Sequence, residues 1–172
     1  MGASKAAVEL GGTPLIRYPL RAMLAAGLDA VVLAKPGTEL PPLEAPVWME
    51  ADEPSHPLTG IVAALEQGRR PLVVCGCDLP FVPAGLLAHL AQRTEPLVAV
   101  EAAGRVHPLL GRYAPELLGD LRDARDARRP LQEVVSELHG KRLDVRRFGD
   151  PAVLTFNVNT PADLARAEEL LG

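Results

Sequence analysis

The segment formed by residues 71–83 constrains the fold of this chain more than any other part of the sequence. Its apolar, β-branched run at residues 72–74 is typical of a strand buried on both faces of a parallel sheet. The run leads to Asp78 and then to two prolines, which prevent the strand from continuing. In open α/β sheets, ligands bind outside the carboxyl ends of the strands. We therefore expect Asp78 to lie where this fold binds a ligand.

Asp78 has two interpretations. Aspartate is rarely buried without a partner, and Mg²⁺ is the usual partner of a lone carboxylate beside phosphates. Alternatively, Asp78 is a solvated residue that caps the turn before Leu79 and Pro80. The segment alone leaves both interpretations open.

Composition excludes several classes of protein. The chain has 172 residues, of which 48% are hydrophobic, and this length favours one domain with its own core. The net charge of −4 argues against a general nucleic-acid binder. We recognise no signal peptide and no apolar run of about 18 residues, so we expect a cytoplasmic protein without a membrane span. Cys75 and Cys77 fit core packing better than a disulfide or a zinc site.

Predicted strands alternate with predicted helices along most of the chain. The strands cover residues 30–34, 47–50, 72–78, 97–101, 108–113 and 143–148, with a further extended segment at 153–158; the helices cover residues 14–26, 58–67, 83–92, 115–123, 130–138 and 161–171, and a charged turn covers 123–129. This alternation favours right-handed βαβ units and an α/β fold with a mostly parallel sheet. The strand–turn–strand segment at residues 97–113 adds an antiparallel part.

Capping residues predict the ends of two helices. Thr13 and Pro14 predict the start of the first helix, and Gly27 predicts its end. Thr160 predicts the N-cap of the last helix, with Asp163 at the capping-box position.

Three further places carry side chains suited to chemistry. Lys5 follows a glycine-containing head and can contact phosphate as a point charge, although many N-terminal lysines are merely solvated. The loop after residue 50 combines Asp52 and His56 with the start of a helix. His107 is held in an extended direction by the proline that follows it; an ordinary turn histidine is the alternative.

The chain has only two asparagines, Asn157 and Asn159, and both precede the last helix. If the backbone is extended there, the two side chains share a face. A turn with a helix cap explains Thr160 and Pro161 well, but it explains the two asparagines only in part.

Taken together, these residues resemble the molybdenum cofactor guanylyltransferases, the MobA family of nucleotidyltransferases. The matching blocks are, in chain order, Met1-Gly2 with Lys5 and Gly11-Gly12-Thr13-Pro14-Leu15, then Pro57-Leu58-Thr59-Gly60, Cys77-Asp78-Leu79-Pro80-Phe81, His107-Pro108 and Phe156-Asn157-Val158-Asn159-Thr160-Pro161. The resemblance spans almost the whole chain. It implies a three-layer, Rossmann-like fold of the GT-A-like nucleotidyltransferases, with a mostly parallel sheet and an antiparallel part.

The same resemblance implies an enzyme that transfers GMP from GTP to the molybdopterin-bound molybdenum cofactor with the help of Mg²⁺. It implies that Asp78 binds the metal and that Lys5 and Asp78 are catalytic. The implied nucleotide contacts are Lys5, Asp52, Gly60 and Asp78, and the implied molybdopterin contacts are His107, Asn157 and Asn159. The implied partners are GTP, molybdopterin and molybdoenzyme acceptors, without nucleic acid or membrane.

The sequence departs from the family pattern in three places. Family members begin with a strand and a glycine-rich phosphate loop before the Met-Gly pair with which this sequence starts. We therefore expect the single domain of residues 1–172 to lack the first strand and that loop, because this sequence starts late, at an internal methionine, or lacks residues of the working protein. If the chain is this short, we expect weak or absent catalysis and either unfolding or strand exchange between copies. Ser4 stands where the family has aspartate, and Lys35 stands where it often has asparagine. Both changes affect expected nucleotide contacts.

The residues also leave other functions open. A related cytidylyltransferase or a sugar-phosphate nucleotidyltransferase is the alternative among enzymes. A non-catalytic protein that holds the molybdenum cofactor or a nucleotide is the alternative from another class. Lys5 and Asp78 favour the enzyme, because a carrier has no need for a metal carboxylate together with a phosphate lysine.

Overall fold

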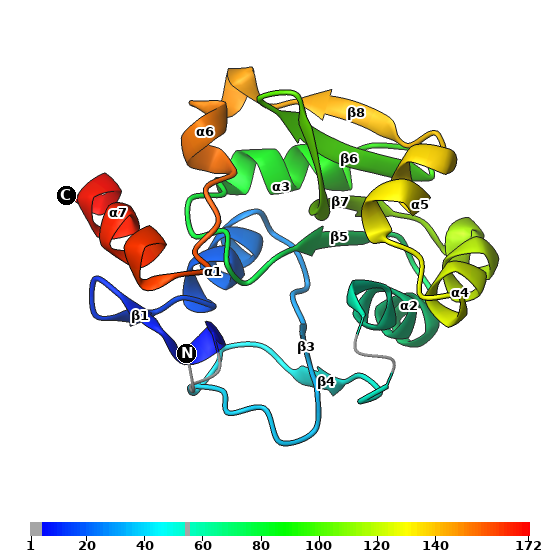
Figure 1. Cartoon of the computed structure of the whole chain (residues 1–172), viewed down its shortest axis with the longest axis horizontal. Coiled ribbons are helices and arrows are strands. Elements are labelled where there is room, and N and C mark those ends of the chain that lie inside the picture. Colours follow the sequence, from blue (N-terminus) through cyan, green and yellow to red (C-terminus); the bar gives the residue numbers. More distant parts are fainter. Residues whose placement is uncertain (1–4, 54–55) are drawn as a thin grey trace.

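The computed structural model describes residues 5–53 and 56–172, and it arranges them in three layers (Figure 1). The helices are α1 (Arg17–Ala25), α2 (Pro57–Gly68), α3 (Ala84–Ala91), α4 (Leu118–Asp126), α5 (Leu131–Glu137), α6 (Pro151–Leu154) and α7 (Pro161–Leu171), with 3-10 turns η1 (Lys5–Ala7), η2 (Pro115–Leu117) and η3 (Arg146–Phe148). The strands are β1 (Glu9–Leu10), β2 (Thr13–Pro14), β3 (Val32–Ala34), β4 (Val47–Met49), β5 (Leu72–Cys75), β6 (Leu97–Ala102), β7 (Arg105–Tyr113) and β8 (Lys141–Asp144).

The main sheet has four strands in the order β5-β7-β6-β8. β7 runs antiparallel to both β5 and β6, whereas β8 runs parallel to β6. β3 and β4 form a separate parallel pair, and β1 and β2 form a small hairpin. The expected α/β class and mixed sheet are confirmed. The main sheet contains fewer parallel strand pairs than expected. In the described part of the chain, β5 pairs with one strand, β7, and that pair is antiparallel.

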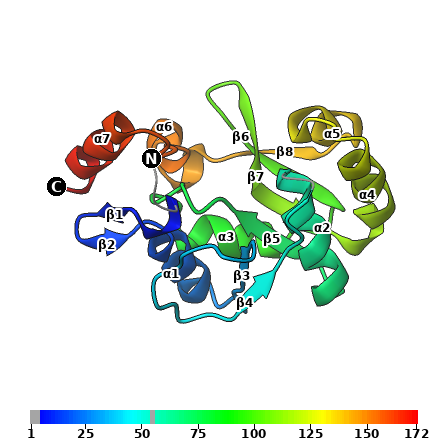
Figure 2. The same cartoon turned by 60° about the horizontal axis from the view of Figure 1, so that its bottom comes forward.

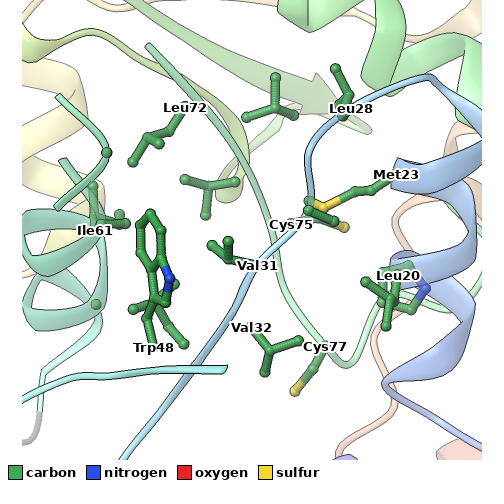
Figure 3. Close-up of a pocket in the computed structure, with 18 of the residues that line it drawn as sticks. Leu20, Met23, Leu28, Val31, Val32, Trp48, Ile61, Leu72, Cys75 and Cys77 are labelled. Atoms are coloured by element: carbon green, nitrogen blue, oxygen red, sulfur yellow. The ribbon is translucent and has the colours of Figure 1, made fainter. Parts of the chain in front are cut away.

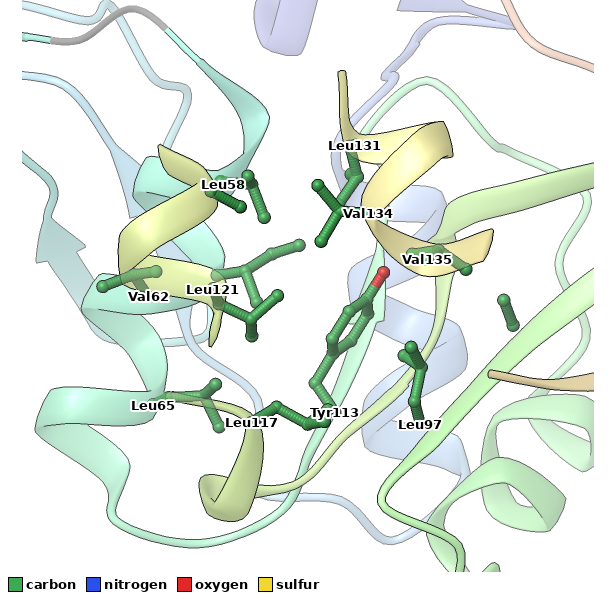
Figure 4. Close-up of a cluster of buried hydrophobic side chains, with 13 residues drawn as sticks. Leu58, Val62, Leu65, Leu97, Tyr113, Leu117, Leu121, Leu131, Val134 and Val135 are labelled. Atoms are coloured by element: carbon green, nitrogen blue, oxygen red, sulfur yellow. The ribbon is translucent and has the colours of Figure 1, made fainter. Parts of the chain in front are cut away.

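Helices cover both faces of this sheet, and the side chains of β6 alternate between them. Leu97 and Ala99 join the buried cluster formed with α2, α4 and α5 (Figure 4). Val98 and Val100 join the cluster formed with α3 on the opposite face. This period of two is what a strand buried on both faces requires. Turned as in Figure 2, the molecule shows the β6–β7 hairpin projecting beyond the helices.

Tyr113 is the largest fully buried side chain, and it lies among the leucines of the first cluster (Figure 4). Its hydroxyl donates a hydrogen bond of 2.7 Å to the main-chain oxygen of Pro108. Burial raises the pKa of this phenol, because an apolar surrounding disfavours the phenolate. Tyr113 thus remains a neutral donor that ties β7 to the core.

The first predicted helix begins later than expected. Thr13 and Pro14 form β2, which pairs with β1 across the turn at Gly11 and Gly12, both with positive φ. Thr13 is therefore not an N-cap, and the helix begins only at Arg17. A two-residue glycine turn matches the twist of a hairpin and outweighs the capping preference of threonine. Gly27, with a φ of +74°, ends the segment as predicted.

The predicted extended segment at residues 153–158 was wrong in its first half. Residues 151–154 form α6 instead. The Asp150 carboxylate caps this helix by accepting a hydrogen bond of 2.9 Å from the Ala152 N–H, and Pro151 suits the first helical position. The predicted strand at residues 143–148 lies instead at 141–144, before η3. At the other end of the chain, the Thr160–Asp163 capping box of α7 is confirmed.

Two further segments differ from expectation. α4 continues to Asp126, so the predicted charged turn at residues 123–129 is partly helical. The strand expected at residues 72–78 ends at Cys75 and is half-buried rather than fully buried. In the described residues, no helix is both long and apolar enough to cross a bilayer.

Cys75 packs against the cluster that contains α3. Burial, followed by the charges of Asp78 and Cys77, raises the pKa of the Cys75 thiol to about 12. Since only the thiolate reacts with iodoacetamide, we expect almost no alkylation of Cys75 at pH 8 in the folded protein and rapid alkylation in urea. Mass spectrometry of tryptic peptides measures both rates. Equal rates in the folded and unfolded protein would show that Cys75 is not buried as described.

Candidate functional site

The turn that follows β5 positions Asp78. The N–H of Gly76 donates to the main-chain oxygen of Leu109 at 2.8 Å, and the N–H of Leu79 donates to that of Gly76 at 3.3 Å. A Cβ at Gly76 would lie 2.6 Å from Oδ1 of Asp78. Glycine therefore gives the carboxylate room to fold back over the turn, at the carboxyl end of β5.

Both asparagines lie directly beside this turn. The main-chain oxygen of Asp78 accepts a hydrogen bond of 2.9 Å from the N–H of Val158, the residue between them. Val158 is buried, and the Asn159 side chain donates to Oδ1 of Asn157 at 2.8 Å. The asparagines thus meet in a loop rather than on a strand face, and the loop is hydrogen-bonded to the backbone of Asp78.

The backbone of Lys5 lies at the same end of β5. It is the first residue of η1, and its neighbour Ala6 is buried in a small cluster with Ile16 and Val32, against which Cys77 packs. The backbone of Lys5 is therefore near the turn that carries Asp78. Gly2 and Ser4, which precede Lys5 in the head of the chain, lie outside the described residues.

His107 also belongs to this end of the sheet. β7 runs antiparallel to β5, and Leu109 already bonds to Gly76 beyond the last residue of β5. His107 lies two residues further along β7 in the direction of Asp78. It is half-buried, and burial, with a smaller contribution from Arg105, lowers the pKa of its imidazole below 6.5.

The lowered pKa of His107 predicts a pH dependence of stability. The unfolded chain binds a proton at His107 more readily than the folded chain, so this histidine stabilises the fold above about pH 6.5 and loses that contribution as the pH falls. We expect His107→Gln to lose less stability than the wild type between pH 7.5 and pH 5.5, as measured by urea unfolding. An NMR titration of His107 that gives a pKa at or above 6.5 would contradict this prediction.

Asp52 and Gly60 lie away from the turn of Asp78: Asp52 is in the loop between β4 and α2, and Gly60 is near the start of α2, which packs against the main sheet. Asp52 is exposed, and its main-chain oxygen accepts a hydrogen bond of 2.9 Å from the Lys35 ammonium. Gly60 lies near the start of α2, where a Cβ would come within 2.5 Å of a carboxylate oxygen of Glu50. His56 caps α2, with Nδ1 accepting from the N–H of Leu58 at 3.2 Å.

A cavity of about 650 Å³ is lined by residues of α1, β3, β4, α2 and β5 (Figure 3). α1, with Leu20 and Met23, and α2, with Ile61, lie on opposite sides of it in this view. Gly60, Cys77 and Lys35 line it, and the Lys35 ammonium donates to the main-chain oxygen of Asp52. The structure therefore gathers Asp78, the asparagines, His107 and the Lys5 backbone at one end of β5, and Gly60 lines the neighbouring cavity.

Lys35 and Glu50 are cavity residues that the sequence interpretation did not select as site residues. Burial raises the pKa of the Glu50 carboxyl, and the positive charge of Lys35 opposes this shift. Each follows directly on a strand of the parallel β3–β4 pair. Their position at the carboxyl ends of parallel strands is the sequence signal that could have identified them.

The described residues include no group of three or more histidine, cysteine, aspartate or glutamate side chains that could hold a metal ion. Mg²⁺ that travels with a nucleotide requires only one or two protein carboxylates, because phosphates and water supply the other ligands. Asp78, half-buried in the turn after β5, suits this role. The residues present therefore fit a divalent cation brought in by a phosphate substrate.

Comparison with known proteins gives results that agree with this geometry. Residues 1–142 match the family described as the MobA-like NTP transferase domain. The chain is 34% identical over 178 residues to the molybdenum cofactor guanylyltransferase of Cereibacter sphaeroides, and the match covers 99% of this chain and 89% of that protein.

Solved structures share the fold. A molybdopterin-guanine dinucleotide biosynthesis protein A from Archaeoglobus fulgidus superimposes with a TM-score of 0.77 at 24% identity, over 99% of this chain and 91% of that one. A Mycobacterium tuberculosis protein solved as a complex with manganese superimposes with a TM-score of 0.76 at 18% identity, over 98% and 93% of the two chains. These likenesses confirm the expected nucleotidyltransferase fold.

Proposed function

The chain belongs to the MobA-like NTP transferase family, and from this premise we propose that it transfers GMP from GTP to the molybdopterin-bound molybdenum cofactor and releases pyrophosphate. The observation that supports the proposal is the main-chain hydrogen bond from the N–H of Val158 to the oxygen of Asp78. It brings the backbone that carries Asp78 next to the loop that carries Asn157 and Asn159, and we infer that the carboxylate serves a metal-bound triphosphate while the two amides serve a pterin. The similarity to a guanylyltransferase supports GTP as the donor.

Each site residue has a role in this proposal. Asp78 would hold Mg²⁺, which supplies charge neutralisation at the phosphate oxygens when it is bound. Lys5 would neutralise part of the triphosphate charge. Asp52 and the α2 start near Gly60 would position the nucleotide, while His107, Asn157 and Asn159 would face the molybdopterin.

The reaction is an in-line displacement at the α-phosphorus of GTP. A terminal phosphate oxygen of the acceptor forms the new bond to phosphorus, and the bond to the bridging oxygen of pyrophosphate breaks. The attacking oxygen is already anionic, so no side chain has to remove a proton from it. The main task of the protein is therefore to orient two anions and to reduce their repulsion.

Calorimetry with GTP, in the presence and absence of Mg²⁺, tests this proposal. We expect GTP to bind only with the metal present and more tightly than CTP. Binding of molybdopterin without any metal-dependent nucleotide binding would instead indicate a carrier of the cofactor. Tighter binding of CTP would indicate a cytidylyltransferase.

We further propose that the protein works in the cytoplasm and passes its product to molybdoenzyme acceptors. Cys75 is not part of a disulfide, which is the usual state of cysteine in that reducing compartment.

A further inference from the structure

A smaller cavity, of about 340 Å³, lies at the end of the main sheet where β6 and β8 finish. This space, the hairpin cavity, is lined by the turn of the β6–β7 hairpin, by β8, by η3 and by the start of α6. Figure 1 and Figure 2 both show the hairpin turn beside α6. β6 and β8 are parallel strands, and ligands of open α/β sheets bind outside the carboxyl ends of such strands. The hairpin cavity therefore has the position of a binding site.

Two side chains of opposite charge line the hairpin cavity without pairing with each other. Arg142 carries a buried Nη1 that has no hydrogen-bond partner in the described part of the chain. Glu101 is half-buried, and across residues 5–53 and 56–172 its carboxylate forms neither a hydrogen bond nor an ion pair. Buried polar groups of folded proteins are normally hydrogen-bonded. Both side chains are therefore available to a molecule that enters the cavity.

Glu101 also occupies a position where its charge works against the sheet. It lies directly opposite Asp144 in the β6–β8 pair, and like charges at opposed positions of neighbouring strands repel. Arg146 donates to the Asp144 carboxylate from its backbone N–H and from its side chain, so Asp144 has a cation beside it and Glu101 has none. A charge that conflicts with its own fold is expected where it serves a function.

The charges of the hairpin cavity restrict what it can bind. Two carboxylates and two guanidinium groups line it, and their formal charges cancel, so neither a phosphate nor a metal ion is favoured by the local field. A neutral ring with both donors and an acceptor along one edge fits better. The Glu101 carboxylate can accept from two adjacent N–H groups of such a ring, and Arg142 can donate to a carbonyl oxygen next to them.

The pterin ring of molybdopterin presents this edge. Its 2-amino group and the neighbouring ring N–H are donors, and its 4-oxo group is an acceptor. The guanine of GTP presents the same groups, but Gly60, a proposed nucleotide contact, lines the cavity beside β5. β6 and β8 are the strands of the main sheet furthest from β5. The pterin is therefore the occupant that fits the hairpin cavity.

The spacing of the strands suits one molybdopterin molecule. Asp78 follows β5, His107 lies in β7 and Glu101 lies in β6, so these residues belong to successive strands of the sheet. Neighbouring strands are about 4.8 Å apart, which places the space between β6 and β8 about 12 Å from β5. The phosphate and the pterin are at opposite ends of molybdopterin. When the phosphate lies beside Asp78, the pterin ring can extend past His107 to Glu101.

We propose that the hairpin cavity binds the pterin ring of the molybdenum cofactor. Glu101 accepts from the 2-amino group and the adjacent ring N–H, and Arg142 donates to the 4-oxo oxygen. Neither residue belongs to the sequence blocks that the chain shares with the MobA family. The choice of ligand rests on the proposed function, whereas the binding itself is measured without any transfer reaction.

Binding of small ring compounds to the 172-residue chain tests the proposal. The probe is 6-hydroxymethylpterin, titrated by calorimetry, and the matched control is 6-hydroxymethyllumazine, which has an oxo group in place of the 2-amino group. We expect the pterin to bind about tenfold or more tightly than the lumazine, because the lumazine has no amino donor for the charged Glu101. Guanosine should also bind more weakly than the pterin. This comparison uses the wild-type chain and does not depend on the folding of a variant.

Two substitutions locate the bound ring. Glu101→Gln should weaken pterin binding about tenfold and remove the preference over lumazine, because the glutamine amide accepts at one atom only. Arg142→Met should weaken both ligands, since both have the 4-oxo group, and Arg142→Lys should restore part of the affinity. Glu116→Gln, a change at an exposed residue of η2, is the matched control and should bind the pterin as the wild type does. Thermal unfolding confirms that each variant is folded.

The outcomes separate this proposal from the proposed function. Absence of saturable pterin binding at millimolar concentration, equal affinity for pterin and lumazine, or unchanged affinity of a folded Glu101→Gln variant would overturn the pterin site even if GMP transfer proceeds. Tighter, Glu101-dependent binding of guanosine would identify the nucleotide as the occupant and would also overturn it. Glu101-dependent pterin binding by a chain that transfers no GMP would support the pterin site and contradict the proposed function alone.

Discussion

Replacing Asp78 with asparagine is expected to reduce GMP transfer by about 10²–10³-fold while the protein remains folded. Asparagine has the same size as aspartate but lacks the negative charge that would hold the metal of the GTP complex. The fold should survive, because the hydrogen bond to Val158 uses the main-chain oxygen of Asp78 and not its carboxylate. The substitution therefore separates the chemistry of the site from its structure.

Asp123→Asn is the matched control for this substitution. Asp123 is an exposed carboxylate on α4, away from the end of β5, so the same change of charge there should leave the transfer rate unaltered. Pyrophosphate release measures the transfer rate of the two variants, and Mn²⁺ binding measures their metal affinity. Thermal unfolding measures their stability. Full activity of the Asp78 variant would rule out the assignment of this residue to the metal.

Replacing Gly111 with alanine is expected to destabilise the protein by about 3 kcal/mol. Gly111 lies in β7, opposite the irregularity in β6 between Ala99 and Val100. A Cβ there would lie only 2.4 Å from the main-chain oxygen of Val98. Backbone atoms cannot rotate away as a flexible side chain can, so the central pair of strands would have to separate.

Gly119→Ala is the corresponding control. Gly119 lies in α4, and no atom is within 4 Å of the position that its Cβ would occupy. Since alanine has a higher helix propensity than glycine, this variant should gain about 0.5–1 kcal/mol. Urea unfolding measures both variants. Similar stabilities would show that β6 and β7 are not as close at Gly111 as the structure places them.

The order of the elements could be predicted because each long element carries its own periodic pattern. α7 is the clearest case, since Thr160, Pro161 and Asp163 determine its first turn locally. Prediction failed where two local patterns compete. Thr13 can cap a helix, but the hairpin across Gly11 and Gly12 places it in a strand instead.

The candidate site could be predicted only in part. Asp78 was expected as the last residue of its strand, whereas the structure ends that strand at Cys75 and places Asp78 in the turn that follows it. The hydrogen bonds that bring Val158 to Asp78 and Lys35 to Asp52 join residues far apart in the sequence. No local pattern encodes such contacts, so the approach of the asparagine loop to Asp78 and that of Lys35 to Asp52 required the folded arrangement.

A transfer assay tests the central claim most directly. The chain is incubated with Mg²⁺, molybdopterin-bound molybdenum cofactor and GTP labelled at the α-phosphate. We predict that label moves from GTP to the cofactor in step with pyrophosphate release, and that CTP does not replace GTP. Metal-dependent GTP binding without any transfer of label to the cofactor, or transfer from CTP in preference to GTP, would contradict the proposed function.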